Sequence, residues 1–282
     1  MITLNDVSKS FKHIQEYLYS ITGIYLDNNS KQTMVKNRLD SLRQNQIFSQ
    51  ASNINDIITI AMRSPQAKQL FINAFTTNKT DFFRENIHFQ DMLDRALPQL
   101  FQTQFSTKIY CAASSTGEEP YSIAATALYA QETCKSSSEV MIYASDIDTD
   151  VLQVAKEGIF NFNPQLNIPE WFCMEKYFHI LQNNSNGTKQ IQAKKEIKNI
   201  IKFLPLNLFD STYPFAKNEF DIIFCRNVLI YFKVEDQEKI LKHLFYHLKI
   251  GGAFYIGHAE DLIGLKDKVE RLGNKTYIKI KD

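Results

Sequence analysis

The sequence contains few cysteines and lacks long apolar segments. The four cysteines, at positions 111, 134, 173 and 225, form no CxxC pair, which argues against a zinc or redox motif, and no metal is expected. Scattered single thiols are typical of a reducing cytoplasm, where we expect the protein to reside. No apolar run approaches the ~20 residues of a membrane span, and the polar start MITLNDVSKSFKHIQ has no signal-peptide core.

An excess of charge of one sign is also missing. The 32 basic and 31 acidic residues give a net charge of +1, so neither nucleic acid nor insertion into a membrane is expected. Walker loops, GxGxxG fingerprints and GxSxG elbows are absent as well. With 282 residues, 44% of them hydrophobic, the chain can form one large or two modest globular domains without a disulfide or metal.

The first 75 residues are predicted to form an all-helical N-terminal domain. Apolar residues recur at spacings of four and three over the first 21 positions, which is the pattern of an amphipathic helix. Further helices are predicted over 31–45 and 54–62, the latter ending before Pro65. The stripe of the first helix comprises Val7, Phe11, Ile14, Leu18 and Ile21.

From residue 76 to 282 short apolar runs alternate with helical stretches. Because the runs are apolar on both faces, they predict a doubly wound α/β domain with a Rossmann-like parallel sheet. The segment 161–200 breaks the alternation, and its turn NNSNG predicts a small β-hairpin insertion. The predicted strands are 109–113, 140–145, 203–208, 221–225 and 253–257, with one more, possibly antiparallel, at 276–280, and the predicted helices are 119–131, 149–157 and 234–249.

The first predicted strand is followed by STGEEPYS (115–122), a sharp turn into a helix. In open α/β sheets ligands bind at the carboxyl ends of the strands, where the strand order reverses. Glu118 and Glu119 at the helix start would repel phosphate, so the loop favours a cationic or amino-bearing ligand. The structural alternative is a capping box between Thr116 and Glu119.

The second predicted strand ends at Asp146 in YASDID (143–148). This acid lies 29 residues after Gly117, the position at which a carboxylate accepts the hydrogen bonds of a ribose diol. The alternative is a helix N-cap, for which Asp148 is the better candidate. A nucleoside ligand without phosphate selection suggests S-adenosylmethionine.

Six motifs follow one another in an order that resembles the chemotaxis-receptor glutamate O-methyltransferases over essentially the whole chain. The resemblance implies a cytoplasmic enzyme that transfers a methyl group from S-adenosylmethionine to receptor glutamates and releases S-adenosylhomocysteine. The motifs are NKTDFFR (78–84), STGEEPYS, YASDID, FLPLNLFD (203–210), FDIIFCRNVLIYF (220–232) and GGAFYIGHAEDL (251–262).

The resemblance also assigns residues to roles. Arg226 and Tyr231 are expected at the reacting centre, where they would orient the incoming carboxylate or the methyl donor. His258 remains open between a ligand contact and a loop hydrogen bond. The residues expected to bind the cofactor are Asn78, Thr80, Arg84, Glu118, Asp146, Asn207, Leu208, Arg226 and Asn227.

The predicted helix over 31–45 carries four basic residues, Lys31, Lys36, Arg38 and Arg43. The resemblance makes this helix the surface that recognises the Glu/Gln-rich helices of the cytoplasmic region of chemotaxis receptors, and a solvated helix face is the alternative. The insertion could dock a receptor tether peptide by strand addition. Two other functions remain open: methylation of another protein or a small molecule, and a non-catalytic adaptor that binds S-adenosylmethionine.

Overall fold

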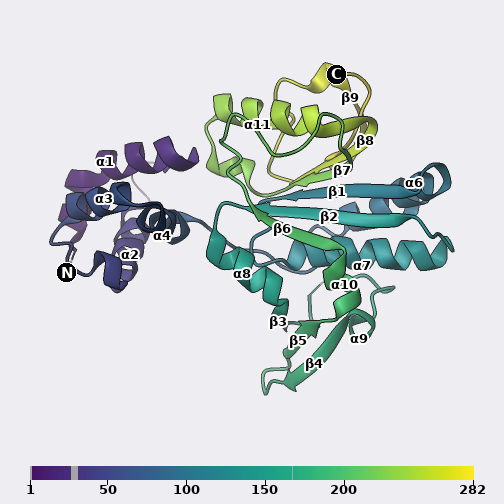
Figure 1. Ribbon diagram of the computed structural model, residues 1–282, viewed down its shortest axis with the longest axis horizontal. Helices are drawn as coiled ribbons and strands as arrows, with labels where there is room; N and C mark the ends of the chain where they lie inside the picture. Colours follow the sequence, from purple (N-terminus) through teal and green to yellow (C-terminus); the bar gives the residue numbers. More distant parts are fainter. Residues whose placement is uncertain (1, 27–30, 167) are drawn as a thin grey trace.

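The computed structural model describes residues 2–26, 31–166 and 168–282 (Figure 1). At its N-terminal end, four helices and a short 3-10 turn pack their apolar sides into one hydrophobic cluster. Capping boxes start two of these helices, from Thr3 with Asp6 and from Asn53 with Asp56. The elements are α1 (Leu4–Thr22), α2 (Gln32–Arg43), η1 (Gln46–Phe48), α3 (Ile54–Arg63) and α4 (Pro65–Phe75).

Helix α4 has no counterpart among the predicted helices. Ser64 is extended, and its side chain accepts a hydrogen bond from the Ala67 backbone N–H, so it caps a new helix that begins at Pro65. Proline is well suited to the first turn, where its missing N–H has no partner to lose. The same residue that ends one predicted helix therefore begins the next.

The remainder of the chain is built on a seven-stranded sheet, which confirms the predicted doubly wound α/β class. Five strands are parallel, and β10 and β9 at one edge run antiparallel to their neighbours. The strand order reverses beside β1, which lies between β2 and β7. In spatial order the strands are β6 (Ile201–Pro205), β2 (Glu139–Asp146), β1 (Ser106–Ala112), β7 (Phe220–Cys225), β8 (Leu248–Ile256), β10 (Thr276–Lys279) and β9 (Val269–Gly273).

Both faces of the sheet are buried, each in its own hydrophobic cluster. Ile109 and Cys111 of β1 belong to one cluster, whereas Tyr110 and Ala112 belong to the other, as the two-residue period of a strand requires. Helix α7 (Glu118–Thr133) covers one face and α11 (Val234–His247) the other (Figure 1). The remaining helical segments are α5 (Ile87–Asp91), the π-helical turn η2 (Met92–Ala96), α6 (Leu97–Thr103), α8 (Thr149–Glu157), η3 (Leu229–Tyr231) and η4 (Lys266–Lys268).

The strand predicted over 203–208 lies earlier in the chain. Its pairing with β2 runs from Ile142 opposite Ile201 to Asp146 opposite Pro205. Proline has no N–H to donate to a ladder, so the strand ends there. Residues 206–208 consequently form a loop at the carboxyl edge of the sheet rather than a strand.

The predicted insertion is larger than a hairpin. Strands β4 (Phe178–Asn183) and β5 (Lys189–Ala193) form the expected hairpin, with a turn in which the Gly187 N–H donates to the Asn184 carbonyl. A third strand, β3 (Ile159–Phe162), pairs with β5 and begins before residue 161. Two short helices, α9 (Met174–Tyr177) and α10 (Lys195–Asn199), flank the hairpin.

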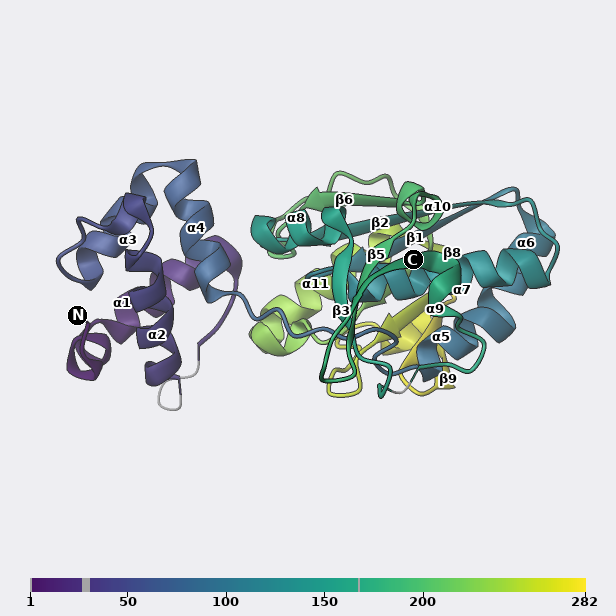
Figure 2. The same cartoon turned by 90° about the horizontal axis from the view of Figure 1, so that it is seen from below.

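The N-terminal helices lie at one end of the sheet, on the side of α8 and α11 (Figure 2). The Tyr25 N–H donates to the Tyr231 carbonyl at 2.9 Å, and the hydroxyl of Tyr19 donates to Asp236 at 2.6 Å. A domain boundary after residue 75 remains a prediction. None of the helices in the described part of the chain has the length and hydropathy that a membrane crossing requires.

Candidate functional site

A cavity opens at the carboxyl edge of the sheet, between the N-terminal helices and the strands. Residues from α1, α2 and the segment between them contribute one side, and the loops after β1, β2, β6 and β7 contribute the other. This is the place where an open α/β sheet binds its ligand. The sequence-predicted residues that line it are Lys31, Asn78, Thr80, Arg84, Asp146, Asn207, Leu208, Arg226, Asn227 and Tyr231.

The loop after β1 has an unusual backbone. Ala113 and Ser115 have φ values of 55° and 50°, and Gly117 has 107°. The left-handed region is sterically costly for residues with a side chain, and it is concentrated at functional sites. Both non-glycine residues line the cavity, so this strain lies at the site itself.

Asp146 is fixed by the backbone around it. Its Oδ2 accepts the Ser115 N–H at 2.8 Å, and its Oδ1 accepts the Asp148 N–H at 2.9 Å. Burial raises the pKa of Asp146 to about 6, although these hydrogen bonds oppose the shift. The alternative role, the N-cap of α8, belongs to Asp148, whose Oδ1 accepts the N–H groups of Asp150 and Val151.

The two glutamates at the start of α7 have different partners. Glu118 accepts a hydrogen bond from Thr116 Oγ1 at 2.6 Å, and within the described chain it is not among the residues that line the cavity. Glu119 lines the cavity and pairs with Arg226. The capping-box alternative is therefore wrong, because the N-cap of α7 is Gly117 and Glu119 turns toward the sheet.

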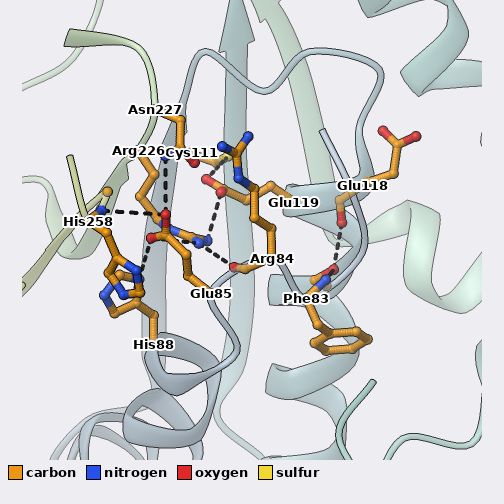
Figure 3. Close-up of polar contacts among 12 residues, drawn as sticks. Phe83, Arg84, Glu85, His88, Cys111, Glu118, Glu119, Arg226, Asn227 and His258 are labelled. Carbon is orange, nitrogen blue, oxygen red and sulfur yellow. Dashed lines mark hydrogen bonds and ion pairs between the residues drawn. The ribbon is translucent and has the colours of Figure 1, made fainter. Parts of the chain in front are cut away.

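Arg226 lies at the centre of a buried polar cluster (Figure 3). Its Nη1 donates to Glu119 Oε2 at 2.8 Å, and its Nη2 donates to the Arg84 carbonyl and to Glu85 Oε2, the latter at 3.3 Å. The guanidinium also stands 5.4 Å from the centre of the Phe89 ring. With a side chain that is fully buried, Arg226 is held in place rather than free to follow a substrate.

The sequence analysis missed Glu85. Burial alone would raise the pKa of Glu85, but Arg226 and hydrogen bonds from Asn227 and His258 outweigh it and hold the pKa below its usual range. The amide of Asn227, a residue with a φ of 58°, donates to Glu85 Oε1 at 3.2 Å. Glu85 thus joins the segment after 78–84 to the loop after β7, a link that no local pattern announces.

Three of the remaining cofactor candidates are held by hydrogen bonds to different parts of the chain. Asn78 donates to Asp148 Oδ2 at 2.8 Å, and Arg84 Nη1 donates to the Lys79 carbonyl at 3.2 Å. Asn207 donates to the Ile21 carbonyl at 3.1 Å and so ties the loop after β6 to α1.

The four basic residues of the predicted recognition helix lie in different environments. Lys31 lines the cavity. Lys36 pairs with Asp40 at 2.7 Å on the same helix. Arg38 Nη1 donates to the carbonyls of Ala74, at 3.3 Å, and Thr76, at 2.7 Å, at the end of α4. Arg43 stands in the last turn of α2, so the four residues do not form one uniform basic face.

Comparison with known proteins agrees with this geometry. The family model described as CheR methyltransferase, SAM binding domain, matches residues 78–278. Chemotaxis protein methyltransferase 2 of Pseudomonas aeruginosa is 37% identical over 95% of this chain and 92% of its own length. The chemotaxis protein methyltransferases of Vibrio parahaemolyticus and Escherichia coli are each 34% identical, over 95% and 96% of this chain and 94% and 91% of their own. The chain belongs to the CheR family of S-adenosylmethionine-dependent chemotaxis protein methyltransferases.

Proposed function

We propose that this protein transfers the methyl group of S-adenosylmethionine to glutamate side chains in the cytoplasmic helices of chemotaxis receptors. The observation that carries the proposal is the charge of the cavity. Arg226 and Glu119 neutralise each other, which leaves three cations facing one carboxylate. These four residues are Lys31, Lys79, Arg84 and Asp146. This balance favours the carboxylate groups of the substrate glutamate and of the methionine end of the cofactor. The expectation that Glu118 and Glu119 select a cationic ligand is thereby corrected, because Glu119 is paired with Arg226 and, within the described chain, Glu118 does not line the cavity.

The cavity fits S-adenosylmethionine. A buried carboxylate at the end of β2, Asp146, is placed to accept the ribose hydroxyls. Asn78, Thr80 and Arg84 are proposed to hold the methionine end of the cofactor. Arg84 would pair with the carboxylate of that methionine. Loop residues Asn207 and Leu208 lie beside the adenine. Glu118, which accepts the Thr116 hydroxyl, is proposed to lie near the amino group.

The reaction requires no general base. A solvent-exposed glutamate has a pKa of roughly 4.3 and is ionised at neutral pH. When bound, S-adenosylmethionine supplies a methyl group on a positively charged sulfur; the carbon–sulfur bond breaks as the carbon–oxygen bond forms. Cation and anion become a neutral thioether and a neutral ester. Because charge is lost, a cavity drier than water accelerates the transfer.

The protein's contribution is alignment. Attacking oxygen, methyl carbon and sulfur must lie nearly in line, with the reacting atoms about 3 Å apart. Tyr231 lines the cavity beside the loop after β7 and is proposed to orient the carboxylate. Arg226 is proposed to act by positioning, because its donors are already bound to Glu119, Glu85 and the Arg84 carbonyl.

Partner recognition is proposed to use two surfaces. Lys31 at the cavity and Arg43 at the end of α2 would attract the acidic helices of the receptor. Strand β4 is an edge of the insertion sheet, and its Ile180 and Leu181 are exposed. Such an edge can accept a receptor tether peptide as an added strand.

The test is methyl transfer from labelled S-adenosylmethionine to receptor-containing membranes, with the label released as methanol by mild alkali. Transfer is expected with receptors that carry their methylated glutamates and not with receptors in which these are alanine. Asp146→Asn should abolish transfer, whereas Asp150→Asn, an exposed acid on α8, should retain it. Label on a small metabolite, or binding without any transfer, would contradict the proposal.

A further inference from the structure

We propose that Glu85, His88 and His258 form a binding site for a divalent transition-metal ion of the zinc type. The three residues come from the segment before α5, from the first turn of α5 and from the loop after β8. Their candidate ligand atoms all lie within 4.8 Å of one another. Figure 3 shows both imidazole rings beside the Glu85 carboxylate.

His88 is prepared as a ligand by its surroundings. Its side chain is completely buried, and its Nε2 lies 2.7 Å from the Asn274 carbonyl oxygen. A carbonyl can only accept, so Nε2 carries the proton and the lone pair is on Nδ1. Metal-binding histidines are commonly fixed by such a hydrogen bond from the second ring nitrogen.

The Nδ1 atom of His88 has no hydrogen-bond partner among the described residues. It faces Glu85 Oε2 across 3.8 Å, which is too long for a hydrogen bond. A buried lone pair without a donor is an unusual feature that a bound cation would explain.

The ligand set and the spacing suit zinc. Two imidazoles and one carboxylate are a common three-ligand set, which leaves a fourth position for water. Ligand atoms around a tetrahedral zinc ion are separated by about 3.3–3.5 Å, so the observed 3.8 Å between His88 and Glu85 needs only a small contraction. His258 is exposed and gives the ion a route from solvent.

The local charge also tolerates a divalent cation. Glu119 and Glu260 are carboxylates close to Arg226 and Asn227, and together with Glu85 they outnumber the single guanidinium. Among the residues that the structure describes, Glu260 accepts from backbone N–H groups, those of Asn227, Val228, Leu229 and Gly257. Arg226 lies 3.3 Å from Glu85 Oε2, so a bound ion would compete with that ion pair.

The test uses the full chain after treatment with a chelator. Calorimetric titration with Zn²⁺ is expected to give one site per chain, and Co²⁺ is expected to give the visible absorption of a low-symmetry nitrogen and oxygen site. His258→Ala should weaken Zn²⁺ binding by at least about 10-fold, because loss of a ligand costs no less than loss of a supporting residue. His179→Ala, an exposed histidine on β4, is the matched control and should bind like the parent.

Because His258 is exposed, its replacement should leave the fold intact, which circular dichroism verifies. His88→Gln gives a second, independent removal of a ligand, and it should also lose the Co²⁺ absorption. Equal Zn²⁺ affinity in the parent and in His258→Ala, or the absence of a Co²⁺ spectrum in the parent, would overturn the assignment. These readouts do not depend on methyl transfer and so are separate from the test of the proposed function.

Discussion

At the scale of single residues, burial decides the chemistry of the acids around the cavity. Asp146, Glu118 and Glu119 all have raised pKa values, with burial as the first cause. Asp146 is held by two backbone N–H groups, whereas Glu119 is paired with Arg226. Of these three acids, Asp146 and Glu119 line the cavity, and the pKa of Asp146 is raised to about 6.

Binding of S-adenosylmethionine should depend on pH through Asp146. Its pKa of about 6 in the free protein means that the proton must leave before both oxygens can accept hydroxyl groups. The affinity for S-adenosylmethionine should be at its maximum above about pH 7. It should fall as the pH drops through about 6, by up to tenfold per pH unit. Calorimetry between pH 5 and 8 checks this. Asp146→Asn should bind weakly at every pH; a pH-independent affinity in the parent would contradict the assignment.

Replacement of Arg226 should lower both the free energy of unfolding and the rate of methyl transfer. Arg226→Met removes the cation between Glu119 and Glu85, and breaking a buried ion pair costs about 3–5 kcal/mol of the free energy of unfolding. Methyl transfer should fall strongly as well. Urea denaturation measures the loss, and Glu119→Gln combined with Arg226→Met should regain part of it. If Arg226→Met and the parent had the same urea midpoint of unfolding, the buried cluster around Arg226 would not stabilise the fold.

At the scale of elements, caps and proline positions explain where the helices and strands end. Ser64 and Pro65 separate α3 from α4, and Pro205 ends β6. In helix α2 the apolar periodicity predicted the helix but not the contacts that its charged side chains make. Its apolar stripe, Val35, Leu39 and Leu42, is buried as expected. Arg38, in contrast, donates a hydrogen bond to the Thr76 carbonyl at the end of α4.

Receptor recognition by α2 should depend on Arg43, in its last turn, more than on Lys36 and Arg38 in its middle. Arg43→Glu should raise KM for receptor methylation about 5- to 10-fold at low salt, and the difference should shrink as salt screens the interaction. Affinity for S-adenosylmethionine should not change. Arg63→Glu, in the last turn of α3, is the matched control; an equal effect of both variants would argue against a specific role of α2.

At the scale of the whole molecule, the N-terminal helices and the sheet both line the cavity. Thr22, Lys31 and Met34 line it from the N-terminal helices, and Asp146 and Arg226 line it from the sheet. Gly257 keeps the loop after β8 close to this wall, because a Cβ there would lie 2.7 Å from the Asn227 amide and the Glu260 carboxylate. The site is complete only when these parts are packed together.

The reaction product should therefore stabilise both parts at once. At 100 times its dissociation constant, S-adenosylhomocysteine should add about 2.7 kcal/mol to the free energy of unfolding. Hydrogen exchange should slow in segments 22–26 and 31–34 as well as in 76–84. Thermal unfolding and exchange measured with and without the product test this expectation. Protection confined to residues after 76 would show that the N-terminal helices do not contribute to binding.

Prediction from sequence succeeded where a feature is encoded locally. Asp146 ends an apolar run, so its position at the carboxyl edge of the sheet followed from the strand pattern. Glu85 gave no such signal: its contact with Arg226 spans 141 residues and that with Asn227 spans 142. The partner of Glu119 was equally hidden, because Arg226 reaches it across 107 residues from the loop after β7, whereas Glu118 meets Thr116, two residues away.

The amino-acid sequence by itself determined the doubly wound sheet, the helical start and the family, because hydrophobic periodicity and contiguous motifs are local properties. Tertiary structure alone decided which charged side chains meet. It joined Glu85 to Arg226, bonded Arg38 to the residues that follow α4, and brought His258 to His88. Charged residues far apart in the sequence meet where strands and loops converge in space. The energy of each pair depends on its burial, and burial cannot be read from the distance between the two residues along the chain.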